Sequence, residues 1–300
     1  MSSENLIRRR IAGLRRHLNY DWEDLGAGHI RATVPSFPYE ALDVSGDKIS
    51  PISLLKLFDS VSSGYFSTSD ADWPTTGADG VEFIPMLYAR NVALDVEPAF
   101  YDVRGQKFPL VVDTRLKYVK RASSCFEKTL FHATSGTLFA KLTGIDVNVD
   151  YVTRKPTPYP DWFRRKIISD IDAAKVEYTI PTKPQVGVFT SHHIIRLSDT
   201  DENRHTNYCT YSRVCLDSLC ENITAGNYGS GLDAYNLALR TMEVTFKKES
   251  KLGDVITVTS WQDAHNRDTF YFEISNLTGD VITTSMMRFY GSKHYAQSKM

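Results

Sequence analysis

The chain has 300 residues, of which 42% are hydrophobic, enough to bury two modest cores or one large one. It carries 35 Lys and Arg against 36 Asp and Glu, a net charge of −1, so composition gives no reason to expect a nucleic-acid partner. No apolar run approaches the length of about 18 residues that a membrane span needs, and no apolar secretory segment opens the chain. Four Cys without the CxxC spacing predict reduced thiols in a cytoplasmic protein and no metal site.

The first 24 residues are expected to form a basic amphipathic helix. Its apolar residues recur at helical spacing, and five arginines lie among them: Leu6, Ile7, Ile11, Leu14, Leu18, Arg8, Arg9, Arg10, Arg15 and Arg16. Three roles stay open for this helix: docking on the body of the protein, attracting an acidic partner such as a carrier protein, or targeting to mitochondria.

Residues 25–152 read as an α+β half. A strand is expected over residues 29–40, and Ser50–Pro51 is typical of a helix start because Ser caps and Pro fits the first turn. The predicted helix ends near Gly64 and carries a strong apolar face with Leu54, Leu57, Phe58 and Val61. An irregular stretch with short strands is expected over residues 65–106. Three strands should follow, over residues 108–120, 124–133 and 137–150.

Residues 153–162 contain three prolines within five positions and are predicted to be a linker. Residues 163–300 then repeat the order of the first half. A strand over residues 186–197 leads through Ser198–Asn207 into a helix, and four strands follow, over residues 238–248, 254–261, 268–275 and 281–290. Consecutive strands with short connections pair antiparallel, so the sequence predicts two α+β halves in tandem.

A polar motif precedes the helix of the second half, and a second, shorter one follows it. The first reads D-T-D-E-N-R-H-T-N-Y-C-T-Y, and the second reads Phe246-Lys247-Lys248-Glu249-Ser250. The first resembles the phrase D-x-D-x-N-x-H-V-N-N-x-x-Y of hotdog thioesterases, matching at Asp199, Asp201, Asn203, His205, Asn207 and Tyr211. It departs at Thr206, where Val is usual, and at Tyr208, where a second Asn is usual. Glu249 stands where the acyl-acyl-carrier-protein (acyl-ACP) thioesterases of plants and bacteria carry a carboxylate after a basic pair.

The resemblance to that family implies a tandem (double) hotdog, in which an antiparallel sheet wraps a long central helix in each half. It further implies a non-catalytic, acyl-binding N-terminal half and a catalytic C-terminal half. It implies an acyl-CoA or acyl-carrier-protein substrate, no cofactor, and a monomeric pseudo-dimer or a homodimer.

Thioester hydrolysis needs a base to activate water and a means to polarise the carbonyl, and the motif offers both. In an extended segment Asp201, Asn203 and His205 would project to one side, with Glu249 positioning water or holding His205. Amides at the start of the helix could hold the developing oxyanion. Asp199 is the alternative acid. The expected substrate-binding residues are Asn207, Tyr208, Tyr211, Leu54, Leu57, Phe58 and Val61.

Two other functions compete with thioester hydrolysis. A hotdog enoyl-thioester hydratase would show D-x-N-P-x-H, but here Arg204 alone separates Asn203 from His205. A non-catalytic double hotdog that binds acyl chains or lipids is favoured by the departures at Thr206 and Tyr208. Release of thiol from an acyl thioester separates the enzyme from the binding protein. A serine hydrolase is disfavoured because no G-x-S-x-G occurs.

Overall fold

The computed structural model describes residues 18–26, 28–37, 41–42, 49–65, 87–102, 107–150, 153–166, 178–201, 204–229 and 232–291. It divides into two compact units that interleave along the chain. The first comprises residues 1–41, 54–90 and 104–176, and the second comprises residues 42–53, 91–103 and 177–300. The predicted domain limits, 25–152 and 163–300, stay a prediction.

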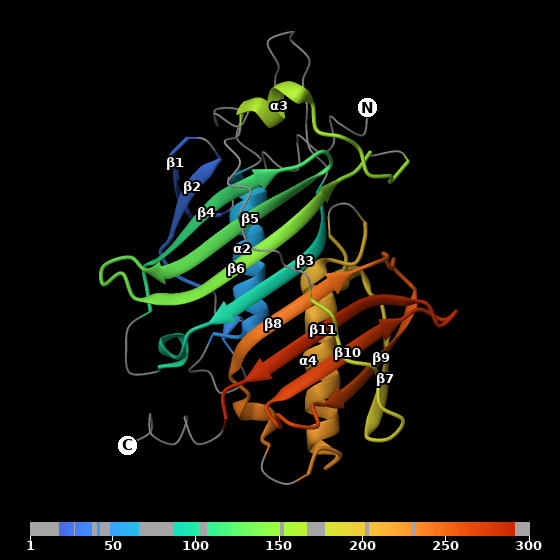
Figure 1. The fold of residues 1–300 in the computed structure, drawn as a ribbon. Coiled ribbons are helices and arrows are strands. Elements are labelled where there is room, and N and C mark those ends of the chain that lie inside the picture. Colours follow the sequence, from blue (N-terminus) through green and yellow to red (C-terminus); the bar gives the residue numbers. More distant parts are fainter. Residues whose placement is uncertain are drawn as a thin grey trace. The chain divides into compact units, whose positions relative to one another are not determined.

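The first unit is an antiparallel sheet with the strand order β1-β2-β4-β5-β6 (Figure 1). Its strands are β1 (Asp21–Asp24), β2 (His29–Val34), β4 (Leu110–Val119), β5 (Ser123–His132) and β6 (Leu138–Asn148). The helix α2 (Pro51–Tyr65) begins where Ser50 accepts the Ser53 N–H at 3.2 Å. In the strands, apolar side chains alternate with polar ones. In the helix, the apolar side chains line one face.

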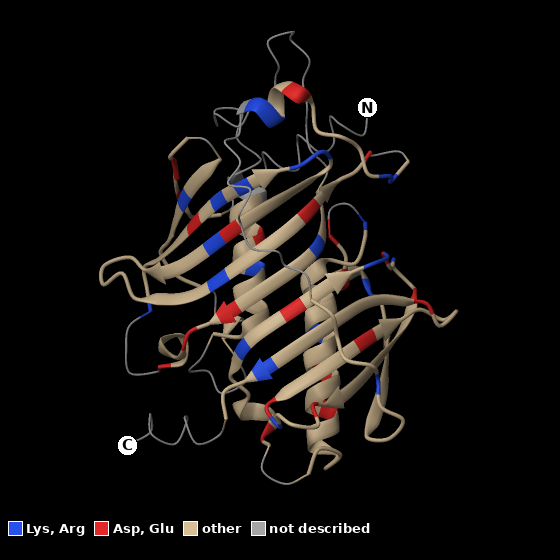
Figure 2. Ribbon diagram, viewed as in Figure 1, with Lys and Arg blue, Asp and Glu red and all other residues tan. Residues whose placement is uncertain are grey.

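Opposite charges pair on the β2, β4, β5 and β6 strands of this unit, as the neighbouring blue and red segments of Figure 2 show. Asp113 of β4 accepts from Arg31 at 2.8 Å, from Arg115 at 3.3 Å and also contacts His29. Although burial raises the pKa of Asp113, the hydrogen bonds from Arg31 and His29 outweigh it and lower the pKa of that carboxyl below its usual value.

The second unit is an antiparallel sheet with the order β3-β8-β11-β10-β9-β7. Its strands are β3 (Leu87–Val96), which pairs with β8 through residues 91–95, β7 (Val188–Ile194), β8 (Leu239–Phe246), β9 (Val255–Gln262), β10 (Thr269–Ser275) and β11 (Val281–Phe289). The helix α4 (Tyr208–Thr224) packs against β7, β9 and β11. Short 3-10 turns lie at Pro98–Tyr101, Leu197–Asp199 and Ala234–Asn236.

Two expectations about secondary structure are corrected. Asp21–Asp24 form strand β1, so the predicted helix over residues 1–24 is wrong at its end, while residues 1–17 lie outside the described residues. The ten-residue strand β3 lies in the stretch expected to be irregular. Long-range pairing with β8, about 150 residues away in the chain, forms β3, and a local pattern does not report such pairing.

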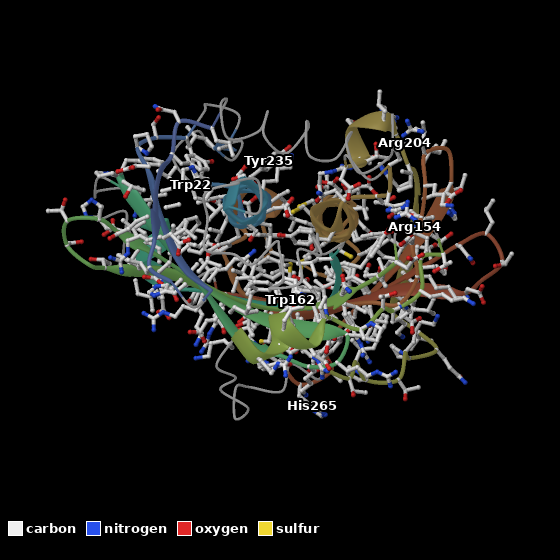
Figure 3. All side chains as sticks on the ribbon, turned by 90° about the horizontal axis from the view of Figure 1, so that it is seen from above. Trp22, Arg154, Trp162, Arg204, Tyr235 and His265 are labelled. Carbon is white, nitrogen blue, oxygen red and sulfur yellow. The ribbon has the colours of Figure 1, made fainter. Side chains whose placement is uncertain are left out.

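The predicted linker is packed rather than free. The Tyr159 N–H donates to the Arg121 carbonyl at 2.8 Å, and the buried Tyr159 ring stacks on Phe163. The six-residue helix α3 (Asp161–Lys166), which carries Trp162 (Figure 3), begins inside the predicted linker. Among the described residues, no helix combines the length and the apolar character needed to cross a membrane.

Candidate active site

His205 lies in a tight turn that directly precedes α4. The Asp201 N–H donates to the His205 carbonyl at 2.9 Å, the Arg204 N–H donates to the Asp201 carbonyl at 3.0 Å, and the His205 N–H reaches Asp201 Oδ1 at 3.3 Å. Arg204, whose exposed side chain is labelled in Figure 3, has a φ of 64°. The expectation of an extended segment is therefore wrong: the chain reverses between Asp201 and His205 because these backbone bonds close a turn. Asn203 lies outside the described residues.

The structure brings the side chain of His205 next to that of Glu249. His205 Nε2 lies 3.4 Å from Glu249 Oε2. The His205 side chain is 8% exposed and that of Glu249 is 35% exposed, so a buried imidazole faces a carboxylate that solvent reaches. An imidazole beside a carboxylate that solvent reaches can act as a base toward a water molecule.

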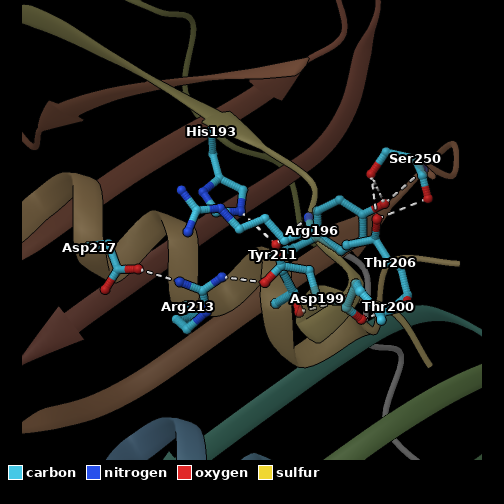
Figure 4. A network of polar contacts seen from close by, with 11 residues as sticks. His193, Arg196, Asp199, Thr200, Thr206, Tyr211, Arg213, Asp217 and Ser250 are labelled. Atoms are coloured by element: carbon cyan, nitrogen blue, oxygen red, sulfur yellow. Dashed lines mark hydrogen bonds and ion pairs between the residues drawn. The ribbon is translucent and has the colours of Figure 1, made fainter. Parts of the chain in front are cut away.

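A buried hydroxyl network joins the His205 turn to the segment that carries Glu249. Thr206 Oγ1 donates to the Ser250 carbonyl at 2.9 Å and lies 2.8 Å from Ser250 Oγ, and the Thr206 N–H donates to the same carbonyl at 3.0 Å. Ser250 Oγ also lies 2.8 Å from the Tyr211 hydroxyl, which accepts the Ser250 N–H at 2.9 Å. Figure 4 shows these bonds among Thr206, Ser250 and Tyr211, which join the segments that carry residues 205 and 249. Sequence reasoning missed Ser250, although a hydroxyl at 206 in place of Val pointed to a polar partner.

Asp199 is the centre of a second polar network, shown with dashed lines in Figure 4. Its Oδ1 accepts from Arg213 at 2.7 Å, and its Oδ2 accepts the Arg196 N–H at 2.8 Å and lies 2.9 Å from His193 Nε2. Arg213 also binds Asp217 at 2.8 Å. Burial acts to raise the pKa of Asp199, but the Arg196 N–H, His193 and the Arg213 charge outweigh it and lower that pKa. Both oxygens of Asp199 are thus engaged in holding the start of the motif.

Asn207 caps α4 and is the last residue of the motif before the helix. Its Oδ1 accepts the Cys209 N–H at 2.8 Å, its carbonyl accepts the Thr210 N–H at 2.9 Å, and its own N–H donates to the Asp199 carbonyl at 2.9 Å. These three amides have acceptors within the protein and do not favour an oxyanion site at this helix end.

Aromatic rings surround the first turn of α4. Phe246 lies 6.3 Å from the Tyr208 ring in an edge-to-face arrangement and 5.8 Å from the Tyr211 ring. Tyr208 and Tyr211 were expected to bind substrate, and they lie next to the His205 turn in sequence and in structure. The other expected substrate-binding residues belong to α2 in the first unit, where Leu54, Leu57, Phe58 and Val61 are at most 2% exposed.

No group of three or more His, Cys, Asp or Glu that could hold a metal ion occurs among the described residues.

Comparison with protein families supports the resemblance found in the motifs. Residues 183–290 match the model of the acyl-ACP thioesterase C-terminal domain, a range that contains both motifs. No curated protein sequence matches the chain.

Solved structures share the fold of nearly the whole chain. An acyl-ACP thioesterase from Bacteroides thetaiotaomicron is 16% identical, with a TM-score of 0.63 over 88% of this chain and 98% of that chain. The 12:0-ACP thioesterase from Umbellularia californica is 13% identical, with a TM-score of 0.64 over 87% of this chain and 94% of that chain. The mostly antiparallel sheets with few helices fit the hotdog fold that the sequence predicted.

Proposed function

We propose that this protein is an acyl-thioester hydrolase that releases a fatty acid from acyl-carrier protein or acyl-CoA. The match of residues 183–290, which lie in the second unit, to the acyl-ACP thioesterase C-terminal domain supports thioester hydrolysis. The observation that carries the proposal within the site is the His205–Glu249 pair, 3.4 Å apart and held by the Thr206–Ser250–Tyr211 network.

In the proposed reaction the His205–Glu249 pair takes a proton from a water molecule as its oxygen attacks the thioester carbonyl carbon. The tetrahedral intermediate collapses, the C–S bond breaks, and the thiolate leaves and is protonated. Asp201 holds the His205 turn through its Oδ1, and the Asn203 amide is proposed to polarise the carbonyl oxygen. The proposed set is Asp201, Asn203, His205 and Glu249, with Asp199 in a supporting role because both of its oxygens are engaged.

We further propose that α2 and α4 are the central helices of two hotdogs, the first binding the acyl chain and the second performing catalysis. Support comes from the motif, which occurs only in the second half, and from the fully apolar face of α2. We keep both acyl-carrier protein and acyl-CoA as predicted substrates. A monomeric pseudo-dimer or a homodimer, and a cytoplasmic or mitochondrial location, also stay predictions.

The departures that favoured a non-catalytic binding protein have a structural role. Thr206 binds Ser250, and Tyr208 packs on Phe246, so neither removes the imidazole or the carboxylate. The hydratase spacing remains unmatched, since one residue separates Asn203 from His205. Hydrolysis is therefore the reaction that the site supports best.

Thiol release tests the proposal. The purified chain should release thiol from acyl-CoA and acyl-carrier-protein substrates of graded length, and His205→Ala should lower kcat by about 10²-fold or more. His192→Ala is the matched control, because His192 is exposed and its Nδ1 lies 3.1 Å from the Thr257 hydroxyl. Circular dichroism should show a folded protein in each case. A folded His205→Ala protein with full activity contradicts the proposal.

A further inference from the structure

A lysine lies in the interior of the first unit, against the helix α2. Lys128 of β5 is 8% exposed, and its Nζ donates to the Phe58 carbonyl of α2 at 3.1 Å. Phe58 belongs to the apolar face of α2 that the proposed function assigns to the acyl chain. Because the ammonium reaches the backbone of α2 at this turn, a charge interrupts the hydrocarbon surface there.

The register of the sheet places a second charged residue on the same face. Lys128 pairs with Leu142, and the pair formed by Ser124 and Asp146 lies four residues away along both strands. Since alternate residues of a strand point to one face of the sheet, Asp146 and Ser124 face α2 together with Lys128. The Tyr159 hydroxyl lies 3.0 Å from Ser124 Oγ and adds a further polar group at this end of the sheet.

The opposite end of the same sheet face is apolar. The next alternate pair on that side is Leu130 and Ala140, and Leu130 pairs with Val112, which in turn pairs with Ala32. All four of these side chains are 0% exposed. The sheet face that lies toward α2 is therefore apolar on one side of Lys128 and carries polar groups on the other.

Lys128, Asp146 and Asp59 of α2 form one electrostatic cluster. Burial raises the pKa of the Asp146 carboxyl to about 6; the Lys128 charge opposes this rise, and the Asp59 charge adds to it. The folded pKa lies above the unfolded value of about 3.9, so stability is lost as the pH rises through the folded pKa. The ionised cluster thus costs stability at neutral pH, and replacing buried charges by hydrophobic residues is often neutral or stabilising. Stability does not explain the cluster, so a functional role is indicated.

A hydrocarbon chain gains from the apolar side of this face and loses at the cluster. Each methylene that is removed from water strengthens binding about fourfold. A methylene that reaches Lys128 or Asp146 would instead take the place of groups that solvate their charges, which is unfavourable. An acyl chain on α2 therefore gains affinity with length only until its end reaches the turn at Phe58.

We propose that Lys128 and Asp146 set the longest acyl chain that the first unit accepts, because they end the hydrocarbon surface of α2 at Phe58. This inference rests on the proposed function, which places the acyl chain on α2. Lys128 is then a specificity-determining residue that takes no part in the chemistry. Its effect comes from charge, whereas apolar residues of α2 such as Leu57 and Val61 act through their bulk.

Binding of free fatty acids measures this length limit without turnover. Across saturated fatty acids from octanoic to octadecanoic acid, we expect the affinity of the unsubstituted protein to rise about fourfold with each methylene and then to stop rising at one length. Lys128→Met keeps a flexible side chain of similar length and removes the charge. In this variant the affinity should continue to rise for at least two further methylenes, a gain of about tenfold or more in calorimetry.

Two further variants make the result specific. Lys141→Met is the matched control, because Lys141 of the neighbouring strand β6 is 46% exposed and binds Glu127 at 2.7 Å. It should leave the length limit unchanged. Lys128→Met combined with Asp146→Asn removes both charges and should melt at or above the temperature of the unsubstituted protein. This double variant carries the test if Lys128→Met alone does not fold.

Three outcomes overturn the inference: an unchanged length limit in the folded variants, an affinity that rises through octadecanoic acid in the unsubstituted protein, and no binding of any fatty acid. Thiol release decides the proposed function separately. If thioesters are hydrolysed, kcat/KM should peak at a longer acyl chain in Lys128→Met than in the unsubstituted protein. If none is hydrolysed, the proposed function fails, and the fatty-acid series still decides the length limit.

Discussion

Thr206 shows how one side chain can hold two distant motifs together, because its hydroxyl bonds Ser250 beside Glu249. The sequence identifies His205 and Glu249 by resemblance, but it cannot report that Thr206 and Ser250 share hydrogen bonds, because they lie 44 residues apart. The reversal of the chain between Asp201 and His205 could not be predicted either. It requires a positive φ at Arg204, and arginine rarely adopts a positive φ. The residues of the candidate site could therefore be proposed from the sequence, whereas the geometry of the site depends on long-range contacts.

Replacing Thr206 by Val, the residue usual in the family, should weaken the His205–Glu249 arrangement. Thr206→Val keeps the backbone bond to Ser250 but removes both hydroxyl contacts. We expect a loss of about 0.5–1.5 kcal/mol in the free energy of unfolding. We also expect a several-fold lower kcat with little change in KM, because the pair is less well held.

Steady-state kinetics and urea unfolding measure both effects. Thr210→Val is a comparison variant, because the Thr210 hydroxyl bonds the Asp199 carbonyl at 3.1 Å and not the Glu249 segment. If kcat is unchanged in a destabilised Thr206→Val protein, the network has a structural role alone.

Asp199→Asn should destabilise the protein at neutral pH and leave turnover largely intact. The substitution removes the charge that faces Arg213 and His193. Because the Arg213 side chain is one-third exposed, we expect a loss of about 1–3 kcal/mol in the free energy of unfolding. Asp217→Asn should cost less, since Asp217 is more exposed than Asp199.

The sign of the pH dependence follows from the lowered pKa of Asp199. The carboxylate stabilises the folded form above its unfolded pKa of about 3.9, and this stability is lost as the pH falls through the still lower folded pKa. The difference in unfolding free energy between the protein and Asp199→Asn should therefore shrink as the pH falls below about 4. A thermal-melting series measures it. Loss of turnover in a folded Asp199→Asn protein would instead make Asp199 the essential acid.

Among the elements, α4 was the one that local chemistry predicted best. A run of capping residues ends at Asn207, and the helix begins at Tyr208. The β8–β11 strands also fall within about two residues of their predicted limits, because alternation and turn residues mark them. Strand β1 was missed although it pairs with β2, the next strand along the chain, and the packed linker was missed because Tyr159 bonds the distant Arg121 carbonyl.

Asn207→Ala tests the cap of α4 at the point where the site and the helix join. It removes the acceptor of the Cys209 N–H, so the free energy of unfolding should fall by about 1 kcal/mol. Asn207→Asp keeps the acceptor and should restore most of the stability. Guanidinium unfolding measures the cost, and amide hydrogen exchange at residues 208–211 should locate it. Equal exchange in both variants would place the cost elsewhere.

At the scale of the whole molecule, the repeated order of strand, helix and strands predicted two α+β halves. The structure instead assigns residues 42–53 and 91–103 to the second unit, so the units interleave. A pattern read along the chain gives the order of elements but not the sheet that each one joins, because β3 joins its sheet by pairing with β8. The order of the elements was thus within reach of the sequence, whereas the sheet that β3 joins was not.

The proposed division of labour predicts that α2 controls acyl chain length and the second unit controls turnover. Leu57 and Val61 are at most 2% exposed on the apolar face of α2. Enlarging either, as in Val61→Leu or Leu57→Phe, should shorten the preferred acyl chain by filling space that a long chain would use. Overpacking should also cost about 1–3 kcal/mol of stability, so the readout is the ratio of kcat/KM between long and short acyl substrates, measured well below the melting temperature. General destabilisation lowers every rate alike and leaves that ratio unchanged. Loss of the space that a long acyl chain would use lowers the rate for long chains alone. A uniform fall across all chain lengths would show that α2 supports the fold without selecting the substrate.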